Sequence, residues 1–112
     1  MGNYTTRLAW ENLRSIDSAT FTGSYQALGT AFTQPSYICK MVNNSTVFVT
    51  ISIDGVNDID ICPASSFWLY DLTKTLNGGS PSLSLPVGTQ FYVKGSAGTG
   101  SVYLVTQYIK GA

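Results

Sequence analysis

The chain has 112 residues, enough for one domain with one hydrophobic core, so we expect no second domain. Charged residues make up only 11% of the sequence, and six basic residues balance six acidic ones without a run of either sign. This balance excludes the electrostatic footprint of a protein that binds nucleic acid or an anionic membrane, and near-zero net charge favours association between molecules. Because the sequence shows neither the apolar run of a signal peptide nor a membrane-length apolar stretch, we expect the protein to stay in the cytoplasm until it is assembled.

The sequence predicts an all-β protein. Turn residues recur between short segments rich in Val, Ile, Tyr, Phe and Thr, and no segment has a helical period. This pattern is typical of a single antiparallel β-sandwich of about eight strands, jelly-roll-like or immunoglobulin-like. We expect the sandwich domain to occupy residues 13–112, after an N-terminal arm of residues 1–12. In chain order, the predicted strands are residues 13–17, 20–28, 37–43, 46–54, 58–62, 67–72, 90–94 and 102–109.

Two segments outside these strands are candidates for contacts. The arm carries Tyr4, Leu8 and Trp10 without the alternation of a strand, so we expect it to pack either on the sandwich or on a neighbouring subunit. Residues 73–86 are rich in Gly, Ser and Pro and are expected to form a long surface loop.

Three turns are predicted from their residues. Asn43 and Asn44, which tolerate left-handed backbone angles, are expected to form the turn between the third and fourth predicted strands. The segment DGVND, residues 54–58, is expected to close a hairpin. The Gly-rich segment KGSAGTGS, residues 94–101, is expected to form a hairpin turn, because it lacks the order of Gly, Lys and Ser or Thr found in a phosphate-binding loop.

The apolar pattern of two strands predicts how they are buried. In residues 46–54 every second side chain is Val or Ile, so one face of that strand is expected to point to the core. In residues 102–109 both faces carry apolar side chains. That strand is expected to need cover on both sides, from a second sheet on one and from a loop or another subunit on the other.

Catalysis is not expected. The sequence contains no His, the one side chain whose ordinary pKa lies near neutrality, so Ser–His, Cys–His and His-ligated metal mechanisms are excluded. A pair of carboxylates remains as an alternative, but nothing in the sequence indicates two that face each other across a cleft. We therefore expect no catalytic residues and no cofactor. The acidic residues are Glu11, Asp17, Asp54, Asp58, Asp60 and Asp71.

The acidic hairpin of residues 54–60 is the one segment with several oxygen ligands suited to Ca²⁺. Its pattern is not that of an EF-hand loop, so we expect a solvated hairpin tip, with a bound cation as the alternative. The candidate ligands are Asp54, Asn57, Asp58 and Asp60.

The two cysteines, Cys39 and Cys62, lie in predicted strands. Two Cys without His cannot form an ordinary zinc site, so no structural metal is expected. We expect two small buried thiols, with a disulfide as the alternative.

Aromatic residues are concentrated in the predicted strand of residues 67–72. Phe67 and Leu69 fall on one face of it and Trp68 and Tyr70 on the other. Both faces need cover, so we expect one to face the core and the other an interface between subunits, with core filling alone as the alternative. The candidate interface residues are Tyr4, Leu8, Trp10, Phe67, Trp68 and Tyr70.

Three stretches carry a resemblance to a known family: ATFTGSYQALGTAF, then CKMVNNSTVFVTISIDGVNDIDICPASSFWLYDL, then LPVGTQFYVKGSAGTGSVYLVTQYI. Over most of residues 19–109 the chain resembles the small β-sandwich structural proteins of tailed bacteriophage virions. The resemblance implies a non-enzymatic virion component present in many copies, on the capsid exterior or around the neck and tail.

The function expected from these features is that of a capsid decoration, or cement, protein. It would form a homo-oligomer and contact other virion proteins, such as the major capsid protein or proteins near the portal. A head-to-tail connector, a tail component or a fibre anchor is the alternative within the same class. From another class, the alternative is a carbohydrate-binding module whose exposed aromatic rings stack on sugars.

Overall fold

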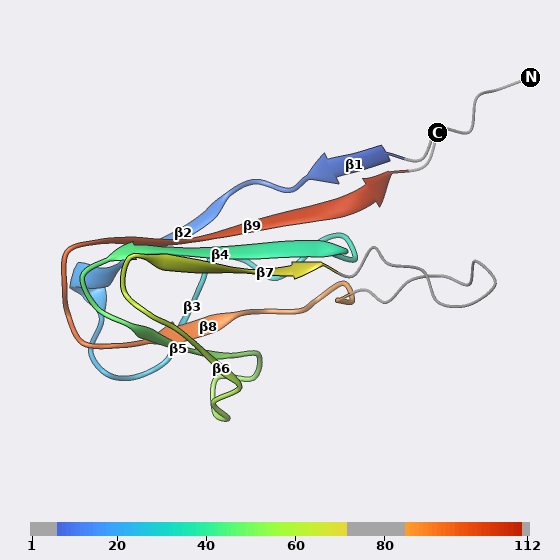
Figure 1. Ribbon diagram of the computed structural model, residues 1–112. Helices are drawn as coiled ribbons and strands as arrows, with labels where there is room; N and C mark the ends of the chain where they lie inside the picture. Colours follow the sequence, from blue (N-terminus) through green and yellow to red (C-terminus); the bar gives the residue numbers. More distant parts are fainter. Residues whose placement is uncertain (1–6, 72–84, 111–112) are drawn as a thin grey trace, which may run out of the picture.

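The computed structural model describes residues 7–71 and 85–110, which form two antiparallel β-sheets packed face to face (Figure 1). The predicted all-β sandwich is thereby confirmed, with nine strands in the described residues. One turn of 3₁₀ helix, η1 (Ser18–Thr20), joins two of the strands. Within these described ranges, no helix combines the length and apolarity that a membrane crossing requires.

The larger sheet is organised around β9 (Gly100–Lys110), whose eleven residues make it the longest strand. One edge of β9 pairs with β1 (Arg7–Trp10) and β2 (Arg14–Asp17) in succession, and its other edge pairs with β4 (Ile38–Ser45). The sheet ends at β7 (Ser66–Asp71), which pairs with β4. Part of the predicted N-terminal arm is therefore a strand of this sheet.

The smaller sheet has the order β3, β8, β5, β6 and consists of short strands. β3 (Gln26–Ala27) pairs with β8 (Tyr92–Lys94), which pairs with β5 (Val49–Ser52). At its far edge lies β6 (Asp60–Cys62). The predicted hairpin of residues 54–58 is confirmed, because β5 and β6 are antiparallel neighbours joined through Gly55, whose φ is +78°.

The core lies between the sheets and follows the alternation of the strands. Val49 and Ile51 are fully buried, as the pattern of residues 46–54 predicts, but β5 is shorter than predicted and Ile53, beyond its end, is 49% exposed. β9 contributes Val102 and Leu104 from its inner face, and segments between strands add Phe32 and other rings. Burying these side chains contributes about 1.5 to 3 kcal/mol each. Cys39 and Cys62 are both buried and free, as expected, and burial raises the pKa of the Cys39 thiol to about 12.

The predicted strand of residues 20–28 is wrong in most of its length. Asp17 accepts a hydrogen bond from the Ala19 amide at 2.9 Å and begins η1, and the chain then bends through Gly23 at a φ of +89°. Only Gln26–Ala27 forms a strand, although the amides of Gly23 and Leu28 also donate to the carbonyl oxygens of Gly95 and Phe91. A local cap and a positive φ therefore override the β propensity of this segment.

The predicted turn at Asn43 and Asn44 is also wrong. Both residues continue β4, which extends to Ser45, and neither has a positive φ. Asn43 is buried, and its amide donates to the carbonyl oxygens of Val47, Cys62 and Pro63 at 2.9 to 3.1 Å. It is a polar residue of the core, and the chain turns only after Ser45.

The Gly-rich segment KGSAGTGS does connect the last two strands, but it is not a hairpin. It leads from β8 in the smaller sheet to β9 in the larger one. Gly100 has a φ of +90°, and a Cβ there would lie 2.1 Å from the carbonyl oxygen of Asn44. This crossing therefore requires Gly at residue 100. The predicted loop of residues 73–86 lies outside the described residues apart from residues 85 and 86.

Candidate interaction surface

The feature that stands out on the described surface is the outer face of the larger sheet, the face turned away from the smaller sheet. Along β4, residues alternate between buried and half-buried, so every second side chain points outward. β9 alternates in the same way. Three rows of directly opposed residues cross this outer face: Phe67, Val42 and Tyr103; Leu69, Lys40 and Val105; and Ile38, Gln107 and Trp10.

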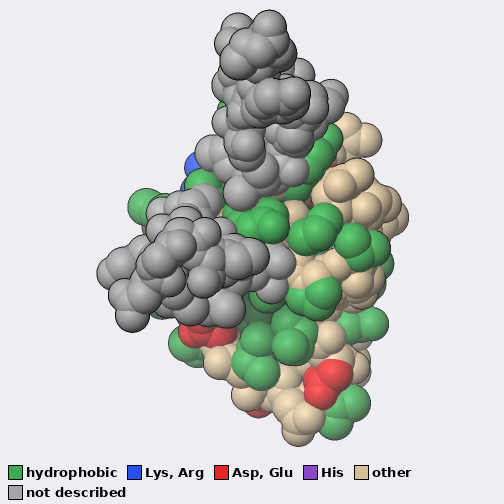
Figure 2. All heavy atoms as spheres, turned by 90° about the vertical axis from the view of Figure 1, so that its right-hand side faces the viewer, with side chains coloured by type: hydrophobic (Ala, Val, Ile, Leu, Met, Phe, Trp, Pro, Cys, Tyr) green, Lys and Arg blue, Asp and Glu red, His purple; other side chains and the backbone are tan. Residues whose placement is uncertain are grey.

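This outer face is mostly apolar and accessible. Trp10 is 62% exposed, Phe67 66% and Leu69 52%. A depression of about 470 Å³ lies on this face and is bounded by Trp10, Ile38, Lys40, Leu69, Val105 and Gln107. At the end of the molecule where β7 and β9 finish, the described surface shows hydrophobic side chains among polar atoms and few charged ones (Figure 2).

The structure brings together only some of the predicted interface residues. Trp10 and Phe67 both lie on the outer face. Trp68 and Tyr70 instead point between the sheets, where their rings stack with centroids 4.0 Å apart and Trp68 also lies 6.3 Å from the ring of Phe91. Tyr4 lies outside the described residues, and so does the side chain of Leu8, whose backbone belongs to β1.

The outer face also contains residues that were not among the predicted interface residues: Ile38, Val42, Leu69, Tyr103 and Val105. They come from three strands that are distant in sequence. The apolar character of both faces of residues 102–109 was the signal for Tyr103 and Val105. Strand alternation was the signal for Leu69, which shares a face with Phe67. Ile38 and Val42 are identified only from the register of β4 with β7 and β9.

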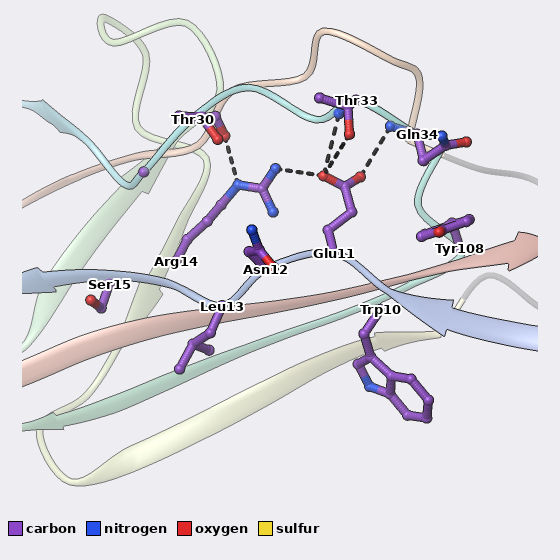
Figure 3. A pocket seen from close by; sticks show the side chains of 11 residues that line it. Trp10, Glu11, Asn12, Leu13, Arg14, Ser15, Thr30, Thr33, Gln34 and Tyr108 are labelled. Atoms are coloured by element: carbon purple, nitrogen blue, oxygen red, sulfur yellow. Dashed lines mark hydrogen bonds and ion pairs between the residues drawn. The ribbon is translucent and has the colours of Figure 1, made fainter.

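A second hollow, of about 660 Å³, lies where β1 turns into β2 (Figure 3). Trp10 and Leu13 point to one side of the chain there, whereas Glu11 and Arg14 point to the other, toward the segment of residues 29–34. Trp10 thus borders both this hollow and the depression on the outer face.

The polar side of this corner is a nearly buried ion pair. Arg14 Nη2 lies 2.8 Å from Glu11 Oε1, and the two side chains are only 5% and 8% exposed. The guanidinium also donates to the carbonyl oxygens of Thr30 at 2.6 Å and Ala31 at 3.2 Å and to the hydroxyl of Thr106 at 3.1 Å. The pair fastens the corner between β1 and β2 to β9 and to the segment of residues 29–34.

Glu11 is held in its charged form by these partners. Burial raises the pKa of Glu11, but the hydrogen bond from Arg14 and those from the backbone amides of Thr33 and Gln34 outweigh burial and lower the pKa below its ordinary value of 4.5. These partners all lie within the chain, so the carboxylate and Arg14 stabilise the fold.

The stability difference between the wild type and a Glu11→Gln variant should shrink as the pH falls. A carboxyl whose pKa is lowered by folding stabilises the native state above its ordinary pKa, and this contribution is lost as the pH falls through the lower, native value. Urea unfolding of both proteins between about pH 6 and about pH 3 measures the difference. A difference that stays constant over this range would show that Glu11 does not titrate with folding.

Asp54 in the acidic hairpin organises the turn. Its carboxylate accepts hydrogen bonds from the backbone amides of Asn57 and Val56, both at 2.8 Å, and from the hydroxyl of Ser52 at 2.8 Å. These bonds, led by the one from the Asn57 amide, hold the pKa of Asp54 far below its usual range. The carboxylate therefore takes the place of backbone acceptors inside the turn.

The other two hairpin carboxylates also have partners within the chain. Asp58 accepts a hydrogen bond from the Tyr25 hydroxyl and lies 3.2 Å from Lys94 Nζ. Asp60 accepts a hydrogen bond from the Tyr70 hydroxyl, across the space between the sheets. In residues 7–71 and 85–110, no three acidic or Cys side chains converge as metal ligands would.

Comparisons with protein-family models, with curated proteins and with solved structures found no match for this chain.

Proposed function

We propose that this protein is a non-enzymatic structural protein of tailed-bacteriophage virions, a capsid decoration protein that stabilises the head by contacts between subunits. The observation that supports the proposal is the apolar outer face of the larger sheet, together with the resemblance of residues 19–109 to that class. An exposed apolar sheet face that meets solvent is typical of a protein that functions in a complex.

The chemistry of the outer face suits permanent assembly. Lys40 is the one charged side chain among those that line the depression, so few charges lose water when the face is covered. Each apolar Å² removed from water contributes about 25 cal/mol, and an interface of standard size buries about 800 Å² on each partner. In the proposed role, the partners are the major capsid protein or proteins near the portal, the chain is made in the host cytoplasm, and its final location is the virion.

Two alternatives make different predictions. A head-to-tail connector, tail component or fibre anchor would use the same outer face but would be present in few copies per particle. A carbohydrate-binding module is favoured by one feature, the hollow of about 660 Å³ that contains Trp10 and Tyr108 beside polar Asn12 and Gln34. If sugars bind there, oligosaccharides will shift the Trp fluorescence of the free protein.

The proposal is tested by adding purified protein to capsids from a phage that lacks its gene. A Val105→Glu variant, which puts a charge in the middle of the outer face, should bind capsids at least about tenfold more weakly than the wild type. Val56→Glu is the matched control, because Val56 is 76% exposed and lies on the β5–β6 hairpin of the other sheet. Its binding should be unchanged.

Thermal unfolding should first establish that both variants are folded. Trp10→Glu is a second outer-face variant, for use if Val105→Glu unfolds. Equal capsid binding by the outer-face variants and the control would contradict the proposal, and so would failure of the wild type to bind capsids.

A further inference from the structure

The last strand of the larger sheet, β7, is an open edge. Within the described residues it pairs with β4 on one side only. The six residues of β7 match β4 one for one, from Ser66 opposite Asn43 to Asp71 opposite Ile38, without a bulge. A regular strand of this kind offers a row of backbone donors and acceptors to another strand.

The other sheet edges in the described part of the chain are protected, and β7 is not. β3 and β6, which border the smaller sheet, have two and three residues. The opposite edge of the larger sheet is divided between β1 and β2, and its residues include Arg7, Arg14 and Asp17. β7 reads SFWLYD: it is longer, contains no Lys, Arg or Pro, and has its single charge at the last residue. Short length, charge and Pro are the usual means of preventing edge pairing, and β7 has none of them before its last residue, Asp71.

The sequence of β7 is complementary to itself. When two identical strands pair antiparallel about a two-fold axis perpendicular to the sheet, residues of the outer face must oppose residues of the outer face. With the axis at Trp68, Phe67 opposes Leu69 of the partner subunit and Leu69 opposes Phe67 of the partner subunit. Two exposed apolar pairs are thereby covered, and such cross-strand pairs stabilise antiparallel sheets.

Neighbouring registers are less favourable. With the axis at Leu69, Phe67 would oppose Asp71 of the partner subunit, an apolar ring against a charge. With the axis at Phe67, Leu69 would oppose Ser65 of the partner subunit, and Ser65 lies outside the strand with a φ of +56°. Only the axis at Trp68 covers Phe67 and Leu69 of both copies with apolar partners.

We propose that two copies of this chain pair antiparallel along β7, centred on Trp68, so that their larger sheets become one continuous sheet. The outer faces of the two copies then join into one larger apolar face. A contact of six residues on each side buries less than the roughly 1,200 Å² of a standard interface, so the dimer should dissociate on dilution in about the micromolar range. The pairing uses the edge of the sheet and does not depend on a role in virions.

Cysteine cross-linking of the full chain tests both the pairing and its register. Phe67→Cys and Leu69→Cys are prepared as separate single variants, since both side chains are exposed, and are then mixed under mild oxidation. Directly opposed residues have Cα atoms about 4.5 to 5.5 Å apart, within the range of a disulfide. Diagonal neighbours are about 7 to 8 Å apart, beyond it. We therefore expect a disulfide between residue 67 of one copy and residue 69 of the other, and little dimer from either variant alone.

Sedimentation equilibrium provides the independent measurement. The wild type should shift from monomer to dimer as its concentration rises through the micromolar range, and Leu69→Lys should raise the dissociation constant at least about tenfold. Val56→Lys is the control, because Val56 is 76% exposed and lies on the β5–β6 hairpin of the smaller sheet, and it should dimerise like the wild type. The proposal would be overturned if the wild type stayed monomeric at about 100 μM. It would also be overturned if each cysteine variant cross-linked with itself as efficiently as the two variants cross-link in the mixture.

Discussion

Replacing Glu11 by Ala is expected to lower the free energy of unfolding by about 3 to 5 kcal/mol, the usual cost of removing one partner of a buried ion pair. The variant leaves Arg14 nearly buried with its charge uncompensated. It also removes the acceptor of the backbone amide of Gln34, at 3.0 Å. The corner between β1 and β2 then loses its attachment to the segment of residues 29–34.

Urea or guanidinium unfolding measures this loss. Asp17→Ala is the matched control, because Asp17 caps η1 from an exposed position and its loss should lower the free energy of unfolding by only about 1 kcal/mol. A loss of less than about 1 kcal/mol for Glu11→Ala would show that the pair is not needed for stability.

Replacing Asn43 by Ala is expected to lower the free energy of unfolding by about 3 kcal/mol or more. The amide of Asn43 donates to three carbonyl oxygens, and its own oxygen accepts from the Ser45 amide at 3.2 Å and from the Ser45 hydroxyl. Each buried polar group left without a partner is expected to cost about 1 to 3 kcal/mol. The variant leaves several such groups at the place where β4 leads toward β5.

Asn44→Ala is the control for this prediction, because Asn44 is the next residue of the same strand and is exposed. Its effect should be within about 0.5 kcal/mol. If the two variants are equally stable, the network around Asn43 does not hold the two sheets together.

The fold class and several elements could be predicted from the sequence because their signals are local. The alternation around Val49 and Ile51 identifies an inward face, and the DGVND segment identifies a hairpin. Asn43 could not be predicted in the same way. Its preference for turns is a local property, whereas the carbonyl oxygens that hold it in a strand include those of Cys62 and Pro63, 19 and 20 residues away. β1 was missed for a similar reason, since its partner β9 lies at the other end of the chain.

The candidate site could be predicted only in part. Trp10 was identified as a large apolar residue in a segment without strand alternation, and Phe67 as part of a strand with apolar side chains on both faces. The faces of Phe67 and Trp68 followed from strand alternation, but which face was buried depended on the second sheet. Trp68 and Tyr70 face that sheet, and Asp60 and Phe91 meet them there. Ile38 and Val42 complete the outer face through the register of β4 with β7 and β9, which no local pattern specifies.

The amount of this chain in purified virions is the most direct test of the proposed decoration role. Quantitative mass spectrometry of purified particles should find it in many copies, in a fixed ratio to the major capsid protein. Its absence from particles would contradict the role, and so would a copy number that fits only a single ring at the neck.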